Sequence, residues 1–104
     1  MVEIGKRVGA LLKETSSAVY FFGYGVYTGE AIPSNEIIYL GRRYNELFPG
    51  DKVAKIKLDN GGSIYGCECW WGPEEYIKKF IGDRQVKIVS LQRHRKINLK
   101  TLID

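Results

Sequence analysis

Two cysteines and a single histidine are the side chains best suited to covalent or metal chemistry in this sequence. Cys67 and Cys69 lie two residues apart, and on a strand this spacing places both side chains on one face. Their Cα atoms then lie about 7 Å apart, too far for an unstrained disulfide. Together with His94 they fall short of the four ligands of a structural zinc site. We therefore interpret both cysteines as reduced, small apolar residues, as in an intracellular protein.

The sequence lacks the arrangements that are typical of catalysis. It has no Ser/His/Asp combination, no GxSxG, no phosphate-binding loop and no metal motif. His94 lies in a basic run that disfavours its protonated form and offers no acidic partner. Cys67 as a nucleophile is one alternative, but it has no activating neighbour in the sequence. Glu68 as a general acid in a dry pocket is another, but paired or edge carboxylates are far commoner in sheets. We expect a protein that is not an enzyme, with no catalytic residue, no metal and no cofactor.

Binding chemistry is better represented, because aromatic residues make up 12% of the chain and several fall on predicted strands. Tyrosine and tryptophan rings stack on nucleobases, while arginines bind phosphates. The alternative is that these aromatic strands simply form the hydrophobic core. The candidate ligand-binding residues are Tyr24, Arg42, Arg43, Trp70, Trp71, Arg93 and Arg95.

The positive charge of the chain is concentrated at its C-terminal end. The formal net charge is +4. Residues 84–104 carry six basic side chains and one acidic side chain. Such an end suits a nucleotide, a nucleic acid or an acidic partner, although a solvated tail is an equally simple explanation. A small basic interaction or nucleic-acid-binding module is therefore the alternative function.

A length of 104 residues and a hydrophobic content of 44% predict a single domain over residues 1–104. A chain of this size buries a core without metals or disulfides. No apolar run approaches the roughly 18 residues of a membrane span, and basic residues interrupt the only early apolar stretch. We expect a soluble, cytoplasmic protein.

The first third of the chain predicts a helix followed by a strand. Apolar residues recur at helical spacing over residues 2–14, namely Ile4, Val8, Leu11 and Leu12. Gly5 and Gly9 weaken this helix, so packing has to hold it. Residues 18–28 form a strand by content, with apolar side chains on both faces. Its two glycines predict a bulge or the close approach of another group.

The remaining segments differ in how clearly they can be assigned. Residues 29–51 are irregular, and a short helix and an ordered loop both fit them. Residues 52–71 predict a hairpin that turns at Asp59-Asn60-Gly61. Residues 73–81 predict a helix, since Pro73 suits a first turn and the charges complement the helix dipole. Residues 85–92 predict a strand, and the basic segment 93–104 either continues it or leaves the domain.

These elements predict an α+β fold: a small, mostly antiparallel sheet with an N-terminal helix and a second helix after the central hairpin. The apolar residues of segment 93–104 predict that it docks, onto this domain or onto a neighbouring chain. We expect a homo-oligomer whose interface contains the first helix and this segment and also forms the ligand site.

Three segments carry a resemblance to a known family: FFGYGVYTG (21–29), KIKLDNG (55–61) and GCECWWGPEE (66–75). They are similar to the anti-Thoeris sponge family (Thoeris anti-defence, type one) of small phage and Firmicute proteins. The resemblance covers about residues 18–80 and is most specific in the hairpin. It implies a catalytically silent homo-oligomer that sequesters cyclic ADP-ribose isomers made by bacterial TIR-domain immune enzymes, with nucleotide bound at subunit interfaces. It assigns no individual ligand contact, so the candidate residues above rest on their chemistry.

Overall fold

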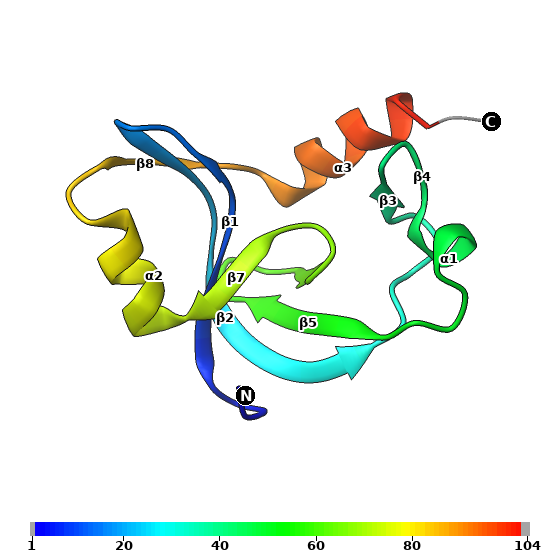
Figure 1. Cartoon of the computed structure of the whole chain (residues 1–104), viewed down its shortest axis with the longest axis horizontal. Coiled ribbons are helices and arrows are strands. Elements are labelled where there is room, and N and C mark those ends of the chain that lie inside the picture. The colour runs from blue at the N-terminus through cyan, green and yellow to red at the C-terminus, as the bar shows by residue number, and fades with distance from the viewer. Residues whose placement is uncertain (1, 103–104) are drawn as a thin grey trace.

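Strands dominate the computed structural model, which describes residues 2–102 (Figure 1). The largest sheet has the order β6-β5-β2-β1-β7, and β8 pairs with β2 outside this path. A second, two-stranded sheet joins β3 to β4. In chain order the elements are β1 (Arg7–Glu14), β2 (Ala18–Ala31), β3 (Ile38–Tyr39), β4 (Arg42–Arg43), α1 (Tyr44–Leu47), β5 (Val53–Leu58), β6 (Ser63–Tyr65), β7 (Trp70–Pro73), α2 (Glu74–Ile81), β8 (Gln85–Ile88) and α3 (Leu91–Lys100).

The large sheet is strongly curled. Its two terminal strands, β6 and β7, are joined only by residues 66–69. Such a short connection brings the two ends of the sheet close together, because each residue spans at most about 3.5 Å. The neighbours along the main path pair antiparallel, whereas β8 runs parallel to β2. The sheet is therefore a half-open barrel, with helices beside its paired strands.

Strand β2 holds the curl together because it pairs with β1 along its first part and with β5 along its second. Gly23 has a φ of 142° and lies where the β1–β2 register shifts, so it forms a bulge. A Cβ atom on Gly25 would lie 2.2 Å from the carbonyl oxygen of Lys57. Gly23 thus forms a bulge, and Gly25 marks the close approach of another backbone, so each predicted explanation holds at one of the two glycines.

The predicted helix over residues 2–14 is wrong, because residues 7–14 form β1 between β2 and β7. Ile4, which the helical pattern assigns to the buried stripe, is 75% exposed. Gly9 lies against the side chains of Ile77 and Tyr24, where a Cβ atom would be 3.0 and 3.1 Å away. A short apolar run flanked by glycines is compatible with a helix or with a strand. The segment forms a strand because β2 and β7 pair with it on both edges.

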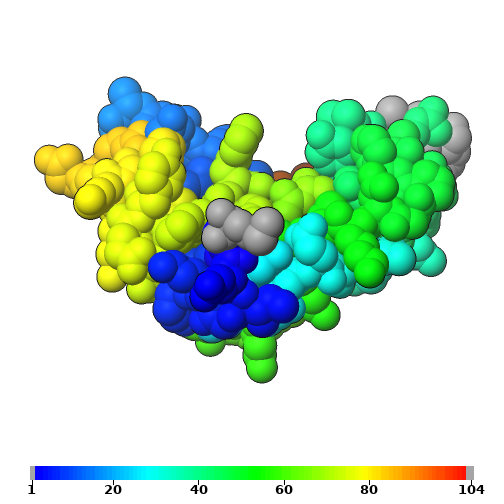
Figure 2. Space-filling model, turned by 60° about the horizontal axis from the view of Figure 1, so that its bottom comes forward, coloured from blue at the N-terminus to red at the C-terminus, as the bar shows by residue number. Residues whose placement is uncertain are grey.

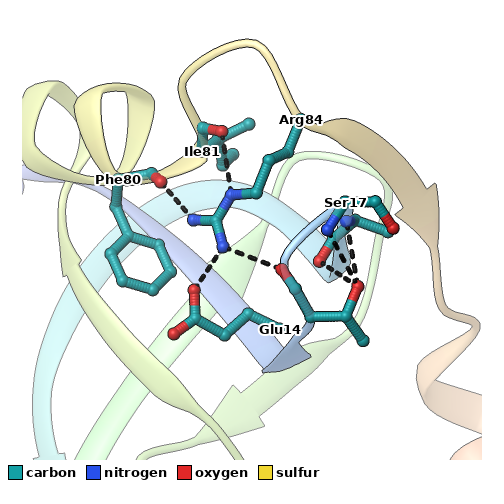
Figure 3. A network of polar contacts seen from close by, with 7 residues as sticks. Glu14, Ser17, Phe80, Ile81 and Arg84 are labelled. Carbon is teal, nitrogen blue, oxygen red and sulfur yellow. Dashed lines mark hydrogen bonds and ion pairs between the residues drawn. The ribbon is translucent and has the colours of Figure 1, made fainter.

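The two faces of β2 are buried in two different clusters, as its apolar composition predicts. Helix α2 covers the outer face, and its predicted position is confirmed. Its C-terminal turn is tied to the β1–β2 turn by Arg84, whose guanidinium donates to the carbonyl oxygens of Ile81 (3.3 Å), Thr15 (3.1 Å) and Phe80 and pairs with Glu14 (Figure 3). The inner cluster contains Val8, Ala10, Phe22, Ile56, Leu58, Ile64 and Leu91; the outer cluster contains Leu11, Val19, Phe21, Ile77 and Ile81.

Two further predictions are wrong in part. The return strand of the hairpin ends at Tyr65, and Trp70 begins β7 on the opposite end of the sheet. The strand predicted over residues 85–92 ends at Ile88, because the Ser90 hydroxyl caps α3 by accepting the N–H of Arg93 (3.3 Å). The basic segment accordingly forms a helix over residues 91–100; Ile103 lies outside the described residues.

The predicted fold class is therefore corrected: a six-stranded curled sheet begins with an N-terminal strand, and helices play the smaller part. Only the loose description as α+β is compatible with this arrangement. None of the helices described between residues 2 and 102 is long and apolar enough to cross a membrane.

Candidate functional site

A cleft of about 750 Å³ lies between the insertion formed by residues 32–52 and the segment that joins β6 to β7. Figure 2 shows the surface hollowed between these two parts, the insertion in green and the joining segment in yellow-green. A volume of this size is typical of small-molecule sites. The lining residues are Leu12, Glu30, Tyr39, Tyr44, Phe48, Val53, Ala54, Gly66, Cys67, Glu68, Cys69, Trp70 and Trp71.

The first wall of the cleft is an aromatic cluster on the insertion. The ring centroids of Tyr44 and Phe48 are 5.0 Å apart, and Tyr39 lies 5.9 Å from Tyr44. The insertion has its own polar supports: the Asn45 amide donates to the carbonyl oxygen of Pro33 (2.7 Å) and Arg43 donates to that of Asn35 (2.9 Å). These contacts, together with the short elements β3, β4 and α1, hold the rings in place on the insertion, for which a short helix and an ordered loop were both expected.

The second wall is made by two tryptophans that face different surroundings. Trp71 stacks on Tyr27, with ring centroids 5.3 Å apart and an interplanar angle of 12°. Trp70 is 74% exposed and also lines a second groove beside Tyr76 of α2. Its indole is therefore accessible from solvent and offers a ring face on which a planar group can stack. Gly66 fits between the walls because a Cβ atom there would lie 3.2 Å from Nε1 of Trp71.

A buried ion pair fixes the segment that carries this second wall. The side chain of Glu68 is 4% exposed and accepts two hydrogen bonds from Arg95 of α3, at 2.9 and 2.7 Å. The same carboxylate accepts the backbone N–H of Tyr65 (3.0 Å), and Arg95 also donates to the carbonyl oxygen of Ser63 (2.7 Å). The bond to Glu68 raises the pKa of Arg95. This contact, which we call the α3 latch, joins the C-terminal helix to the floor of the cleft.

Neither cysteine has the environment of a nucleophile. Both lie in the turn between β6 and β7, so the prediction that they share one face of a strand is wrong. Burial and the neighbouring Glu68 raise the pKa of Cys67 to about 11, and burial raises that of Cys69 further above the ordinary range of a thiol. Thiolate is the reactive form, so both side chains are mostly unreactive thiols near neutral pH. Among residues 2–102 no cluster of His, Cys, Asp and Glu forms a metal site.

The structure brings some of the predicted ligand-binding residues together and separates others. Trp70 and Trp71 line the cleft. Arg42 is not among the lining residues, but it lies opposite Tyr39 in the β3–β4 register, so these two side chains share one face of that hairpin. Arg43 supports the insertion through Asn35 and lies 3.8 Å from Glu46.

Three others lie elsewhere. Arg95 is engaged in the α3 latch, and Arg93 lies on the exposed side of α3. Tyr24 packs against Phe21 on the outer face and lines a different, smaller groove. The basic end of the chain therefore supplies structural support to the cleft and no phosphate-binding group that lines it.

The aromatic wall of the insertion is the part of the site that the candidate list omits. Tyr44 and Phe48 are at helical spacing, but the helix is only four residues long and Tyr39 lies on a separate two-residue strand, so periodicity gives little reason to group the three rings. The available signal is compositional: three aromatic rings within ten residues of a polar, glycine- and proline-containing insertion. Carboxylates are the other omission, since Glu30 and Glu68 line the cleft and only Glu68 is neutralised by an ion pair within the described chain.

In comparisons with known proteins, no protein family, curated protein or solved structure matches the chain.

Proposed function

We propose that this protein binds a small nucleotide in the aromatic cleft and sequesters it without chemical change. The observation that carries the proposal is the pairing of two aromatic walls on separately anchored segments, Trp70 and Trp71 on one side and the Tyr39 cluster on the other. A planar base placed between such walls is stacked and sheltered from water. Rigid walls also favour tight binding, because less ordering is required when the ligand enters.

The polar groups of the cleft suit the two ends of a nucleotide. Glu30 offers an acceptor for an exocyclic amino group or a ribose hydroxyl. Arg42, on the Tyr39 face of the β3–β4 hairpin, is the guanidinium that reaches a phosphate at the rim. Neither role needs a nucleophile or a proton-transfer group, in agreement with the raised thiol pKa values.

The resemblance of three sequence segments to the anti-Thoeris sponge family supports a specific ligand, a cyclic ADP-ribose isomer. On this proposal the protein acts in the bacterial cytoplasm, where TIR-domain immune enzymes make the signal, and it withholds that signal from its receptor. The cleft volume of about 750 Å³ accommodates such a molecule.

Co-purification tests ligand and mechanism together. The protein is expressed beside an active TIR-domain enzyme, purified, heated to release what it holds, and the released fraction is measured by mass spectrometry. We expect the intact cyclic nucleotide. Release of a hydrolysed product would show an enzyme, and a fraction without nucleotide would overturn the proposal.

A pair of matched variants locates the site. Trp70→Ala removes a ring shared by the cleft and the second groove, whereas Tyr76→Ala removes an exposed ring of the second groove alone. Loss of one stacking ring weakens binding by about ten- to one-hundredfold. By calorimetry we expect that loss for Trp70→Ala and none for Tyr76→Ala. The reverse result would move the ligand to the α2 side.

The alternative function, binding to nucleic acid, has one observation in its favour. Arg93, Lys96 and Lys100 are exposed at spacings of three and four residues, so they share one face of α3. Three phosphate contacts give a slope of about −2 in log K against log salt for a single-stranded oligonucleotide. A salt titration with such an oligonucleotide separates the two functions, since a ligand held in the cleft depends far less on salt.

We also propose that the protein is a homo-oligomer that associates through α3, where Ile97 and Leu99 are exposed. The other half of the interface expected from the sequence, a helix at residues 2–14, does not exist, because those residues contribute a paired strand. The variant Ile97→Ser/Leu99→Ser is expected to lower the mass measured by light scattering to that of a single chain. An unchanged mass, or a monomer for the unaltered chain, would overturn this part of the proposal.

A further inference from the structure

Strand β8 has a free edge, and no strand in the described part of the chain covers it. It pairs only with β2, in parallel. Gln85 and Val89 donate their N–H groups to the carbonyl oxygens of Ser17 (3.0 Å) and Phe21 (2.9 Å). Because alternate residues of a strand point to the same side, the N–H and C=O groups of Val86 and Ile88 point away from the sheet. Those groups form a short template for one more strand.

The side chains along this edge are unusually apolar for a free edge strand. Val86 is 42% exposed and Ile88 is 70% exposed. They lie opposite Val19 and Phe21 of β2, on the outer face, and line a mainly apolar groove of about 390 Å³ together with Tyr24 and others. A strand added at this edge would place its own apolar side chains, every second residue, in contact with this groove.

The opposite face of the same edge is positively charged. The Nζ atoms of Lys87 and Lys13 lie 5.7 and 4.8 Å from the ring centroid of Tyr20. No carboxylate of residues 2–102 lies within 4.0 Å of either ammonium group. An added strand therefore lies next to the uncompensated ammonium group of Lys87, whereas Lys13 lies on β1, beyond β2. A Glu or Asp side chain of the added strand fits opposite Lys87.

The same charge argues against a second copy of β8 as the occupant. Two β8 strands that pair Val86 with Ile88 about a two-fold axis place Lys87 directly opposite its own copy. Like charges at directly opposite positions destabilise a strand pair, and a lysine in the middle of an edge strand is a common device against self-association.

We propose that the β8 edge is a docking site for an extended segment of a partner protein in which acidic and apolar residues alternate. The apolar side chains contact Val86, Ile88 and the groove, and the acidic side chains face Lys87. The anchoring of β8 supports this role, because the Arg84 network at its start and the cap of α3 after its end fix the strand in position (Figure 3). Such a template needs little ordering when a peptide adds to it.

The test uses a fluorescently labelled peptide, Ser-Val-Glu-Val-Glu-Val-Ser, and its counterpart with lysine in place of glutamate, by anisotropy with the full chain. We expect saturable binding of the acidic peptide alone. Ile88→Pro removes an outward N–H and leaves the ladder to β2 intact, so it should weaken binding about fivefold, the effect of one hydrogen bond of typical net strength. Lys87→Glu should exchange the preference between the two peptides.

Peptides with N-methyl groups on alternate residues test the same contact on the unaltered protein. This test therefore does not depend on whether the Ile88→Pro variant folds. Methylation of one alternate set should abolish binding, and methylation of the other should spare it. Equal binding of acidic and basic peptides, no saturable binding, or no difference between the methylated sets would overturn the proposal. A concentration-dependent dimer that Ile88→Pro abolishes would do so too, by assigning the edge to a second copy.

Discussion

Helices α2 and α3 attach to the same curled sheet near opposite ends of the molecule, yet different interactions hold them (Figure 1). α2 buries Ile77 and Ile81 in the outer cluster, and Arg84 adds a partly exposed ion pair. α3 buries only Leu91 and also lies against β3. Its specific side-chain contacts include the His94 ring against Phe22 (5.5 Å between centroids) and the latch of Arg95 to Glu68. α2 is thus part of the core, while α3 depends on polar contacts that can be broken singly.

The largest loss of stability is expected from a substitution in α2. Ile77→Ala removes a side chain that is 3% exposed and lies against Gly9 and Leu11, so the free energy of unfolding should fall by about 3 kcal/mol. Urea denaturation measures it, with the adjacent exposed Tyr76→Ala as control. A loss below that of the control would show that α2 is not part of the core.

Breaking the α3 latch should have a smaller and more local effect. Arg95→Met leaves Glu68 buried without its partner, which costs about 2 kcal/mol, less than a fully buried pair because Arg95 is partly exposed. Hydrogen exchange should report faster exchange in α3 and in residues 66–69, with α2 unchanged.

The double variant Glu68→Gln/Arg95→Met is the matched control, since it removes both charges. Its stability should lie closer to that of the unaltered chain than to that of Arg95→Met. Equal losses for the single and the double variants would mean that packing of the arginine side chain, and not the charge pair, holds α3.

Elements with local sequence signals could be predicted from the sequence, whereas elements that depend on long-range pairing could not. Helix α2 carries local signals that agree with each other, a proline at the start, ordered charges and an apolar stripe, so its position follows from residues 73–81 alone. Strand β1 and the return strand of the hairpin depend on long-range pairing. The pairing of β1 with β7 joins Val8 to Pro73 and Ala10 to Trp71, residues more than fifty positions apart, which no local pattern encodes.

The candidate site shows the same limit. Trp70 and Trp71 stand out by residue type, and the structure places both on the cleft. Arg95 stands out for the same reason, but Glu68, 27 residues earlier, pairs with it and makes it structural. Composition shows which side chains are able to bind phosphate, and only the fold shows which of them already have an internal partner.

The pH dependence of stability offers a finer test of the α3 side. Burial lowers the pKa of His94, Arg95 lowers it further, and Glu68 partly opposes both. The native protein therefore binds fewer protons than the unfolded chain just below the ordinary histidine pKa of about 6.5. The contribution of neutral His94 is complete above that pH and is lost as the pH falls toward the lowered value.

Hydrogen exchange of α3 should accordingly be faster at pH 5.5 than at pH 7.5, after correction for the intrinsic pH dependence of exchange, and α2 should show no such change. His94→Phe preserves an aromatic contact with Phe22 and removes the titration, so it should abolish the difference. An unchanged pH response in that variant would assign the effect to another group.

The smallest expected change is in the labelling rate of the two thiols beneath the α3 latch. It tests the difference between the α2 and α3 ends of the molecule without a substitution in the core. Cys67 and Cys69 flank Glu68, and their raised pKa values and half-buried positions predict negligible labelling by iodoacetamide in the native state at pH 7.5. Opening of residues 66–69 exposes them to solvent. Arg95→Met should therefore speed their labelling, followed by mass spectrometry, whereas Arg84→Met on the α2 side should not. Rapid labelling of the unaltered chain would mean that the latch is open in solution, and equal rates in both variants would show that the two ends of the molecule unfold together rather than separately.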